Sequence, residues 1–323
     1  MWSLFPVHKP RIGISIRAHR LELVEVRHRW RRPPVVRRLV SRPLPAGLVA
    51  PSPTAANLTI YETVVQELRA LCEGVRDRTV AVDLPLAAGT FALFHFETFP
   101  QSREEQDALV KWRFRQDEHV TATDLHVVSQ VFAGQREGNV PAPVSVLAVA
   151  IRQSLLSQYH RLCDDAGLLP VSMGFSTLHL LELYRRAMPA HADVFFAHRT
   201  AEAMIVVALR HGRPSLLRVK PLRRTTVDLK PELLTTLQYF HSQSLHRCSS
   251  GNVARTVLYV LDDTAVARRA EASAATEVWT PTDDPDWAVE MIPVTWSMAP
   301  LSSSAVEIPD VPPFGALAGV VAS

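Results

Sequence analysis

A strand–turn–strand segment near the start of the sequence carries the residue types that most suggest chemistry. It reads IGISIRAHRLELVEV over residues 12–26, and its turn is Arg17-Ala18-His19-Arg20. Hairpins of this kind often hold a phosphate group, using glycine, a small hydroxyl or a carboxylate that binds a metal ion. This turn offers two arginines, a histidine and an alanine instead. It can therefore be a phosphate loop, a degraded phosphate loop or a plain hairpin, and the surrounding elements must decide.

Other groups of reactive side chains favour structural roles. The sequence has 13 histidines but no H-x₃-H or HExxH spacing of the kind that binds zinc. His241 and His246 lie five residues apart on an expected helix, which suits a shared metal ion poorly. Asp164 and Asp165 are adjacent acids that could act in acid–base catalysis. They lie at an expected helix end, however, and we favour the interpretation that they are solvated charges. We therefore expect no metal ion and no catalytic residue among them.

The segment KWRFR at residues 111–115 mixes cations with aromatic side chains. Such a mixture can stack on nucleic acid. At helical spacing, however, Trp112 can face the core while the cations face water, and we favour that interpretation. The same helix is also a candidate border for a groove that takes a partner peptide.

Composition points to a folded chain of more than one domain. The chain has 323 residues, of which 47% are hydrophobic and 21% are charged, so two domains or one large bilobal unit are expected. No apolar run reaches the ~20 residues that span a bilayer. The start, MWSLFPVHKPR, lacks the features of a signal peptide, and the three cysteines form no CxxC pair. These features predict a cytosolic protein without disulfides or zinc.

The net charge of +3 hides an uneven distribution. Residues 1–42 hold 11 Lys and Arg against Glu22 and Glu25, a balance of +9, so the rest of the chain carries −6. A basic region of this kind can face anionic lipid, nucleic acid or an acidic partner. It can equally be the solvated rim of a β-meander, and the sequence leaves these alternatives open.

The hydrophobic pattern predicts the same order of elements, β-β-β-α-β, at residues 11–84 and again at residues 193–261. The first copy has strands at 11–16, 21–28, 35–41 and 80–84 and a helix at 59–72. The second copy ends with a helix at 231–246 and a strand at 256–261. The periodicities of 2 and 3.6 residues carry these assignments. The copies share the order of their elements rather than their residues.

The block between the copies, residues 85–175, reads as β-α-β-β-α-β, an α+β subdomain. Its first helix, at 102–117, begins with Ser102 and Glu105, which fit a capping box. Beyond residue 261 we expect a helix at 264–273, a strand near 276–279 and a helix of small residues at 314–322.

Five segments, in this order, resemble the type IV pilus assembly protein family PilM. The first is the opening strand pair, which follows the family pattern I-G-I-D-I-G-x-x-x-x-K-x-V-E. The others include a Leu-Pro pair followed by an acidic helix, an Ala-Gly-Leu before a proline, and an Arg-x-Gly turn. The segments lie at residues 12–26, 81–117, 145–173, 198–214 and 311–323.

The resemblance implies an α/β fold of the bilobal actin-like (ribonuclease H-like) type, with two β-β-β-α-β lobes and an inserted α+β subdomain. It also implies the domain boundaries. Residues 1–84 would begin the first lobe, residues 85–175 would form the insert, residues 176–192 would be a helix returning to the first lobe, and residues 193–323 would form the second lobe.

The sequence departs from the family where actin-like proteins hold nucleotide. In the first hairpin, the family's Asp falls on Ser15 and its first Gly on Arg17. In the second hairpin, the family's Asp falls on His198 and its Gly on Thr200. In the third loop, a Ser-Gly-Gly turn is replaced near Val260-Leu261-Asp262-Asp263.

These positions are therefore vestigial nucleotide-site residues in this interpretation. A backbone approaches phosphate closely only where side chains are absent, and carboxylates hold the Mg²⁺ that neutralises phosphate charge. The resemblance combined with these losses predicts a pseudo-ATPase that binds no ATP and no other cofactor or small molecule.

By the resemblance, the function is that of a scaffold in a pilus or related secretion machine. PilM-like proteins lie at the cytoplasmic face of the inner membrane, where they bind the cytoplasmic tail of PilN and link it to the motor. Related actin-like modules form the cytoplasmic domain of the type II secretion protein GspL. Two alternatives stay open: an ATP-binding actin-like switch of the same machinery, and a basic protein that binds nucleic acid. We expect no nucleic acid, but an anionic membrane surface is a candidate partner for residues 1–42.

Overall fold

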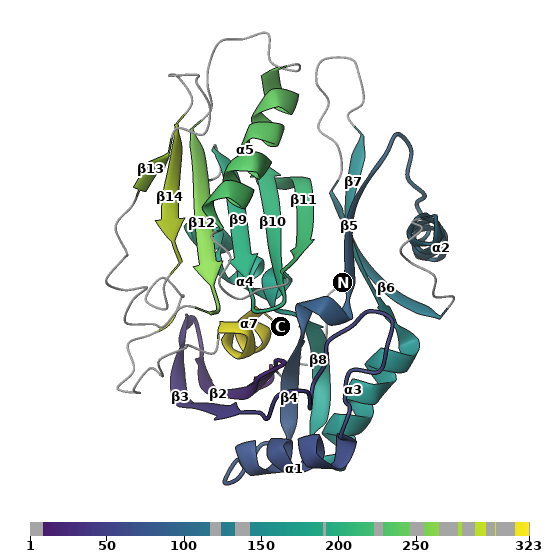
Figure 1. Cartoon of the computed structure of the whole chain (residues 1–323), viewed down its shortest axis with the longest axis vertical. Coiled ribbons are helices and arrows are strands. Elements are labelled where there is room, and N and C mark those ends of the chain that lie inside the picture. The colour runs from purple at the N-terminus through teal and green to yellow at the C-terminus, as the bar shows by residue number, and fades with distance from the viewer. Residues whose placement is uncertain are drawn as a thin grey trace. The chain divides into compact units, whose positions relative to one another are not determined.

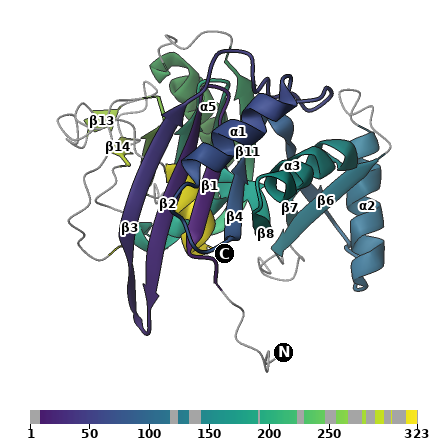
Figure 2. The same cartoon turned by 90° about the horizontal axis from the view of Figure 1, so that it is seen from below.

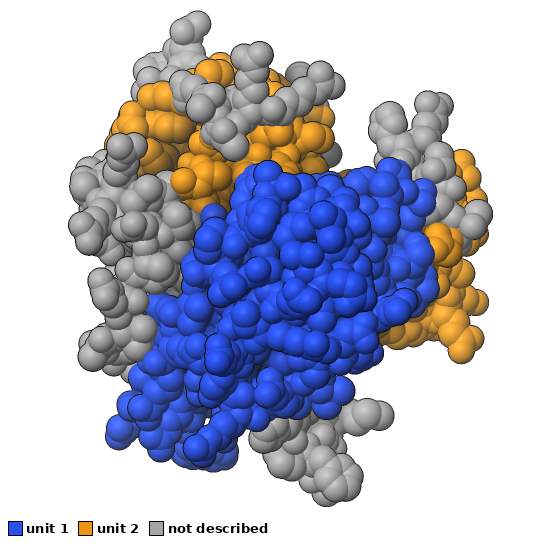
Figure 3. All heavy atoms as spheres, turned by 60° about the horizontal axis from the view of Figure 1, so that its bottom comes forward, with its two compact units in different colours: residues 1–89, 152–187, 296–323 blue, residues 90–151, 188–295 orange. Residues whose placement is uncertain are grey.

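The computed structural model divides the chain into two units, each built from separate stretches of sequence (Figure 3). Unit 1 holds residues 1–89, 152–187 and 296–323, and unit 2 holds residues 90–151 and 188–295. The structure describes the following residues: 9–116, 124–132, 143–189, 192–222, 229–245, 255–264, 277–279, 288–294, 301 and 314–322.

Unit 1 is organised around a five-stranded sheet with the order β3-β2-β1-β4-β8. Its strands are β1 (Ile12–Ile16), β2 (Arg20–Arg29), β3 (Arg32–Pro43), β4 (Thr79–Leu84) and β8 (Leu169–Phe175). Strands β1, β2 and β3 form an antiparallel meander, while β4 runs parallel to β1 and β8 runs parallel to β4. β1 is buried along its whole length, as expected of a central strand.

Helices cover both faces of this sheet (Figures 1 and 2). Helices α1 (Tyr61–Leu71) and α3 (Gln153–Asp165) pack against each other, α1 on β2 and β3 and α3 on β8. α1 buries one stripe, Val64, Val65, Leu68 and Leu71, because apolar residues three and four apart share a helix face. On the other face, α4 (Ser176–Tyr184) and α7 (Phe314–Ala322) pack together, and α7 lies on β1 and β4. Short 3₁₀ turns at Leu86–Ala88 and Arg185–Ala187 complete the elements of unit 1.

Unit 2 contains a six-stranded sheet with the order β11-β10-β9-β12-β14-β13. Its core joins this sheet to helix α5 (Lys230–Leu245), through side chains that include Phe195, Met204, Leu237 and Phe240. The strands are β9 (Asp193–Arg199), β10 (Ala203–Arg210), β11 (Arg213–Pro221), β12 (Thr256–Asp262), β13 (Glu277–Trp279) and β14 (Val289–Pro293).

Unit 2 also holds a three-stranded sheet with the order β5-β7-β6, against which helix α2 (Arg103–Arg115) packs. The strands are β5 (Thr90–Phe96), β6 (Leu125–Phe132) and β7 (Val144–Arg152). Ser102 caps α2 by accepting a hydrogen bond from the Glu105 backbone N–H at 3.2 Å, which is the Ser102 half of the predicted capping box. Val110 and Phe114 of α2 are buried in this second core. Trp112 was expected to face the core, but its side chain is half exposed.

The two large sheets share one topology. In each, three antiparallel strands are followed by a helix and a fourth strand that pairs in parallel with the first: β4 with β1 and β12 with β9. This confirms the β-β-β-α-β repeat and the fold class expected from the sequence.

Three elements lie elsewhere than the sequence analysis placed them. α3 and β8 belong to unit 1 rather than to an insert at 85–175, and α7 belongs to unit 1 rather than to the lobe of residues 193–323. β14 was not expected, because its five residues stand in a polar, proline-rich stretch. The helix predicted at 264–273 falls largely outside the described residues.

Candidate functional site

The centre of the candidate site in unit 1 is Asp83, at the carboxyl end of β4. Because β4 runs parallel to β1, Asp83 pairs in register with Ser15. Both side chains are fully buried, and Ser15 Oγ donates to Asp83 Oδ2 at 2.9 Å. A buried carboxylate is costly unless hydrogen bonds and an opposite charge compensate it. The serine supplies one of those bonds.

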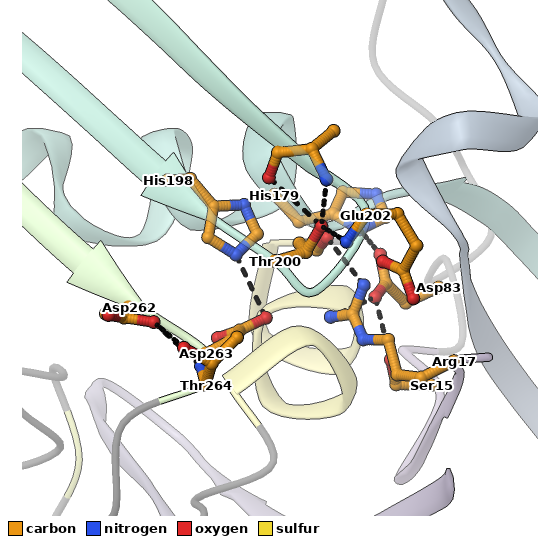
Figure 4. Close-up of polar contacts among 12 residues, drawn as sticks. Ser15, Arg17, Asp83, His179, His198, Thr200, Glu202, Asp262, Asp263 and Thr264 are labelled. Carbon is orange, nitrogen blue, oxygen red and sulfur yellow. Dashed lines mark hydrogen bonds and ion pairs between the residues drawn. The ribbon is translucent and has the colours of Figure 1, made fainter. Parts of the chain in front are cut away.

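Arg17 supplies the opposite charge. Its Nη2 lies 3.0 Å from Asp83 Oδ2, and its Nη1 donates to Ser176 Oγ at 3.0 Å. The Arg17 side chain is only 7% exposed, so this ion pair is screened little by water. The turn that holds it is closed by a hydrogen bond from Arg17 N–H to the Arg20 carbonyl at 3.0 Å. In unit 1, the Arg17 guanidinium therefore pairs with the Asp83 oxygen, Oδ2, that a metal cation would otherwise bind (Figure 4).

Helix α7 covers the same ion pair. A Cβ placed on Gly315 would stand 2.3 Å from Arg17 Nη2, 2.3 Å from Asp83 Oδ2 and 3.0 Å from Ser15 Oγ. Since real Cβ atoms do not approach other atoms so closely, only glycine allows the helix to lie on the pair. The backbone of α7 at Gly315 thus covers the charged groups of Arg17 and Asp83.

His179 of α4 is the fifth polar group of this cluster. Its Nδ1 lies 3.9 Å from Asp83 Oδ1, which is beyond hydrogen-bonding distance. Burial lowers the pKa of His179 to about 4, because removing the imidazolium from water disfavours the charged form. His179 is therefore neutral at pH 7 and contributes no positive charge to Asp83.

In unit 2, the corresponding strand ends carry a histidine–carboxylate pair. β9 and β12 are parallel, with His198 in register with Leu261. His198 is fully buried, and its Nε2 lies 2.9 Å from Asp263 Oδ2 in hydrogen-bonding contact. Leu261 is also fully buried and offers no polar group. Figure 4 shows the imidazole of His198 directed at Asp263.

The turn between β9 and β10 uses its own backbone donors. Thr200 Oγ1 accepts hydrogen bonds from the N–H groups of Glu202 and Ala203 at 3.3 and 3.1 Å. Thr200 N–H in turn donates to the Ala203 carbonyl at 2.8 Å. A phosphate hairpin needs such amides to point at its ligand. Here a threonine hydroxyl takes two of them.

Asp262 is likewise engaged locally. Its Oδ1 accepts from Thr264 N–H at 2.9 Å and from Thr264 Oγ1 at 2.6 Å, and its Oδ2 accepts from Arg199 Nη1 at 3.1 Å. The carboxylate therefore caps the end of β12 and pairs with the neighbouring strand β9. Both carboxylate oxygens of Asp262 thus accept hydrogen bonds from residues of unit 2.

The six positions predicted from the sequence fall into two groups. Ser15 and Arg17 form part of the unit 1 cluster, and His198, Thr200, Leu261 and Asp262 lie at the corresponding strand ends of unit 2. Sequence reasoning missed the residues that complete the unit 1 cluster: Asp83, Ser176, His179 and Gly315. In unit 2 it placed Asp263 in the third loop but did not predict its pairing with His198. One signal was available, because Asp83 is an acid at the end of the apolar strand VAVDL.

Within the described ranges, no three His, Cys, Asp or Glu side chains gather as a metal site would require. Across the same part of the chain, no helix combines the length and apolarity needed to span a membrane. Cys72 and Cys163 are buried free thiols, and burial raises the pKa of Cys72 to about 11, so Cys72 is protonated at pH 7.

Comparison with known proteins identifies the fold. No family model and no curated protein matches the sequence. Among solved structures, the PilM–PilN type IV pilus biogenesis complex superposes with a TM-score of 0.67 at 21% identity, over 97% of this chain and 98% of that chain.

Two further similarities are weaker. An actin-like ATPase-fold protein of unknown function from Bacteroides thetaiotaomicron has a TM-score of 0.45 at 10% identity, over 81% of this chain and 84% of that chain. The cytoplasmic domain of EpsL, an inner-membrane component of the Vibrio cholerae type II secretion system, has 0.42 at 9%, over 78% and 81%. The repeated β-β-β-α-β sheets and the PilM–PilN match together show that this chain has the actin-like fold seen in that pilus complex.

Proposed function

We propose that the chain is a non-catalytic scaffold of a type IV pilus or related secretion machine, located at the cytoplasmic face of the inner membrane. In this proposal it binds the cytoplasmic tail of a PilN-like membrane protein and links that protein to the motor. The observation that carries the proposal is the similarity in fold to the PilM–PilN complex over 97% of this chain. The match spans both units of the chain.

The test is binding of the tail itself. A peptide with the N-terminal cytoplasmic sequence of a PilN-like protein from the same genome is titrated into the full chain by calorimetry, with a scrambled peptide as control. We expect saturable one-to-one binding in the micromolar range or tighter, about −8 kcal/mol. Equal heats for the tail and the scrambled peptide would contradict the proposed role.

We also propose that the protein neither binds nor hydrolyses ATP. In unit 1, Asp83 Oδ2 is already engaged by Arg17 and Ser15 and lies under Gly315. A metal ion at Asp83 would have to displace the buried guanidinium and the helix backbone above it. Phosphoryl transfer would then lack the electrostatic support of a carboxylate-bound Mg²⁺.

Calorimetry with Mg-ATP, run beside ATP with a chelator, tests this second point. We expect no saturable heat in either titration. A sub-micromolar affinity that depends on Mg²⁺ would overturn the proposal and favour an actin-like switch.

A further inference from the structure

The β2–β3 hairpin of unit 1 ends in an exposed tryptophan surrounded by arginines. β2 is longer than β1, which pairs with it only as far as Glu25, so the hairpin extends beyond β1 and β4 (Figure 2). Its two-residue turn is Trp30-Arg31, and the Trp30 side chain is 86% exposed. Residues 26–38, VRHRWRRPPVVRR, hold six arginines and no acid.

Two arginines at the tip have no acidic partner among the described residues. Arg29 and Arg32 stand directly opposite each other across the hairpin, and like charges in that position destabilise a strand pair. Both side chains are exposed, and in the described part of the chain no ion pair to an acid is found for either. Arg31 packs its guanidinium 5.7 Å from the Trp30 ring centre. The tip therefore presents concentrated positive charge next to an indole.

The β10–β11 hairpin of unit 2 is the equivalent of the β2–β3 hairpin, so the residues of the two turns can be compared. There, β10 and β11 are joined by His211-Gly212, and both residues adopt the left-handed conformation, at φ 50° and φ 73°. Its flanking Arg210 is paired with Asp193. At the position in unit 1 that corresponds to Gly212, Arg31 adopts φ 54°. This left-handed conformation is uncommon for residues other than glycine. The unit 1 tip thus has tryptophan and arginine where the unit 2 tip has histidine and glycine.

We propose that the β2–β3 tip is an attachment point for an anionic lipid surface. Trp30 would lie at the level of the lipid headgroups, where an amphipathic indole is favoured. The arginines would contact headgroup phosphates, which accept paired hydrogen bonds from guanidinium groups. One aromatic ring at the end of a narrow hairpin suits insertion between headgroups, whereas single-stranded nucleic acid is bound on a platform of several aromatics.

A protein partner that adds a strand is disfavoured at the same place. β3 is an edge strand, but Pro33 and Pro34 stand next to the tip, and proline has no N–H to donate to an added strand. The proposal does not depend on the identity of the tail partner considered above, because that test uses a peptide in the absence of lipid.

Vesicle co-sedimentation of the full chain tests the proposal. We expect binding to phosphatidylcholine vesicles with about 30% phosphatidylserine, and little binding to pure phosphatidylcholine. The paired change Arg29→Gln/Arg32→Gln should weaken binding about 25-fold, at roughly fivefold for each charge near the surface. Trp30→Ala should weaken it about fivefold.

Helix α2 provides matched controls. Trp112→Ala removes another exposed tryptophan, and Arg103→Gln/Arg115→Gln removes two exposed arginines. Both control variants should bind vesicles as the wild type does. The proposal is overturned if the tip variants bind as tightly as the controls. It is also overturned if tip variants that retain the wild-type melting temperature lose affinity for duplex DNA while keeping affinity for vesicles.

Discussion

The replacement Arg17→Met tests whether the unit 1 cluster is a structural ion pair. Methionine keeps much of the side-chain volume but removes the charge 3.0 Å from the fully buried Asp83 carboxylate. Breaking a buried pair by removing one partner costs about 3–5 kcal/mol, because the remaining charge is left uncompensated. For lobes of this size, that corresponds to a fall in melting temperature of roughly 10 °C.

The measurement is thermal unfolding followed by circular dichroism, with two comparison variants. Arg17→Met/Asp83→Leu removes both charges and should recover most of the loss, since an apolar pair often replaces a buried ion pair without penalty. Arg255→Met breaks the exposed contact of Arg255 with Glu290 and should change the melting temperature little. The reasoning is refuted if Arg17→Met is no more destabilising than Arg255→Met, or if the double variant melts no higher than the single one.

Three further variants test the clusters separately. Gly315→Ala should destabilise the protein by about 1–3 kcal/mol in chemical denaturation, because its Cβ would meet the Asp83 carboxylate; unchanged stability would mean that α7 does not lie on the pair. The pKa of His179 is about 4 when folded, below its unfolded value near 6.5, so the unfolded state takes up the proton first as the pH falls. Stability due to this group is complete above about pH 6.5 and should fall by about 2 kcal/mol between pH 7 and pH 5; an equal fall in His179→Gln would show that another group is responsible. His198→Leu removes a buried hydrogen bond to Asp263 and should cost about 1.5–3 kcal/mol, whereas a neutral result would mean that the carboxylate finds water instead.

The sequence predicted the repeated sheets well because each strand and helix carries its own periodicity. α7 has the predicted bounds, 314–322. The assignment of elements to units was less successful, because the residues within α3 or α7 do not indicate which sheet the helix will pack on. Those choices depend on contacts between segments far apart in the chain.

The candidate site was predicted only in part, because it too depends on contacts between distant segments of the chain. Ser15 and Arg17 were identified from their own hairpin, but their partners come from distant segments. Asp83 lies 68 residues from Ser15, and Ser176 lies 159 residues from Arg17. Only the parallel pairing of β1 with β4 and the position of α4 bring these groups together. The resemblance predicted that Ser15 and Arg17 stand where the family has ligand residues, whereas the ion pair between Arg17 and Asp83 could not be predicted from the sequence.

The position of α7 has a consequence for how the protein is made. Unit 1 is assembled from three separated stretches of the chain, and residues 314–322 supply the helix that covers Asp83 and Arg17. During synthesis, the first sheet therefore leaves the ribosome long before its cover exists. Such long-range closure slows folding and leaves apolar surface exposed in the meantime. We expect the nascent first lobe to depend on chaperones until α7 has been synthesised, and a chain shortened before residue 314 to accumulate as an incompletely folded, protease-sensitive species.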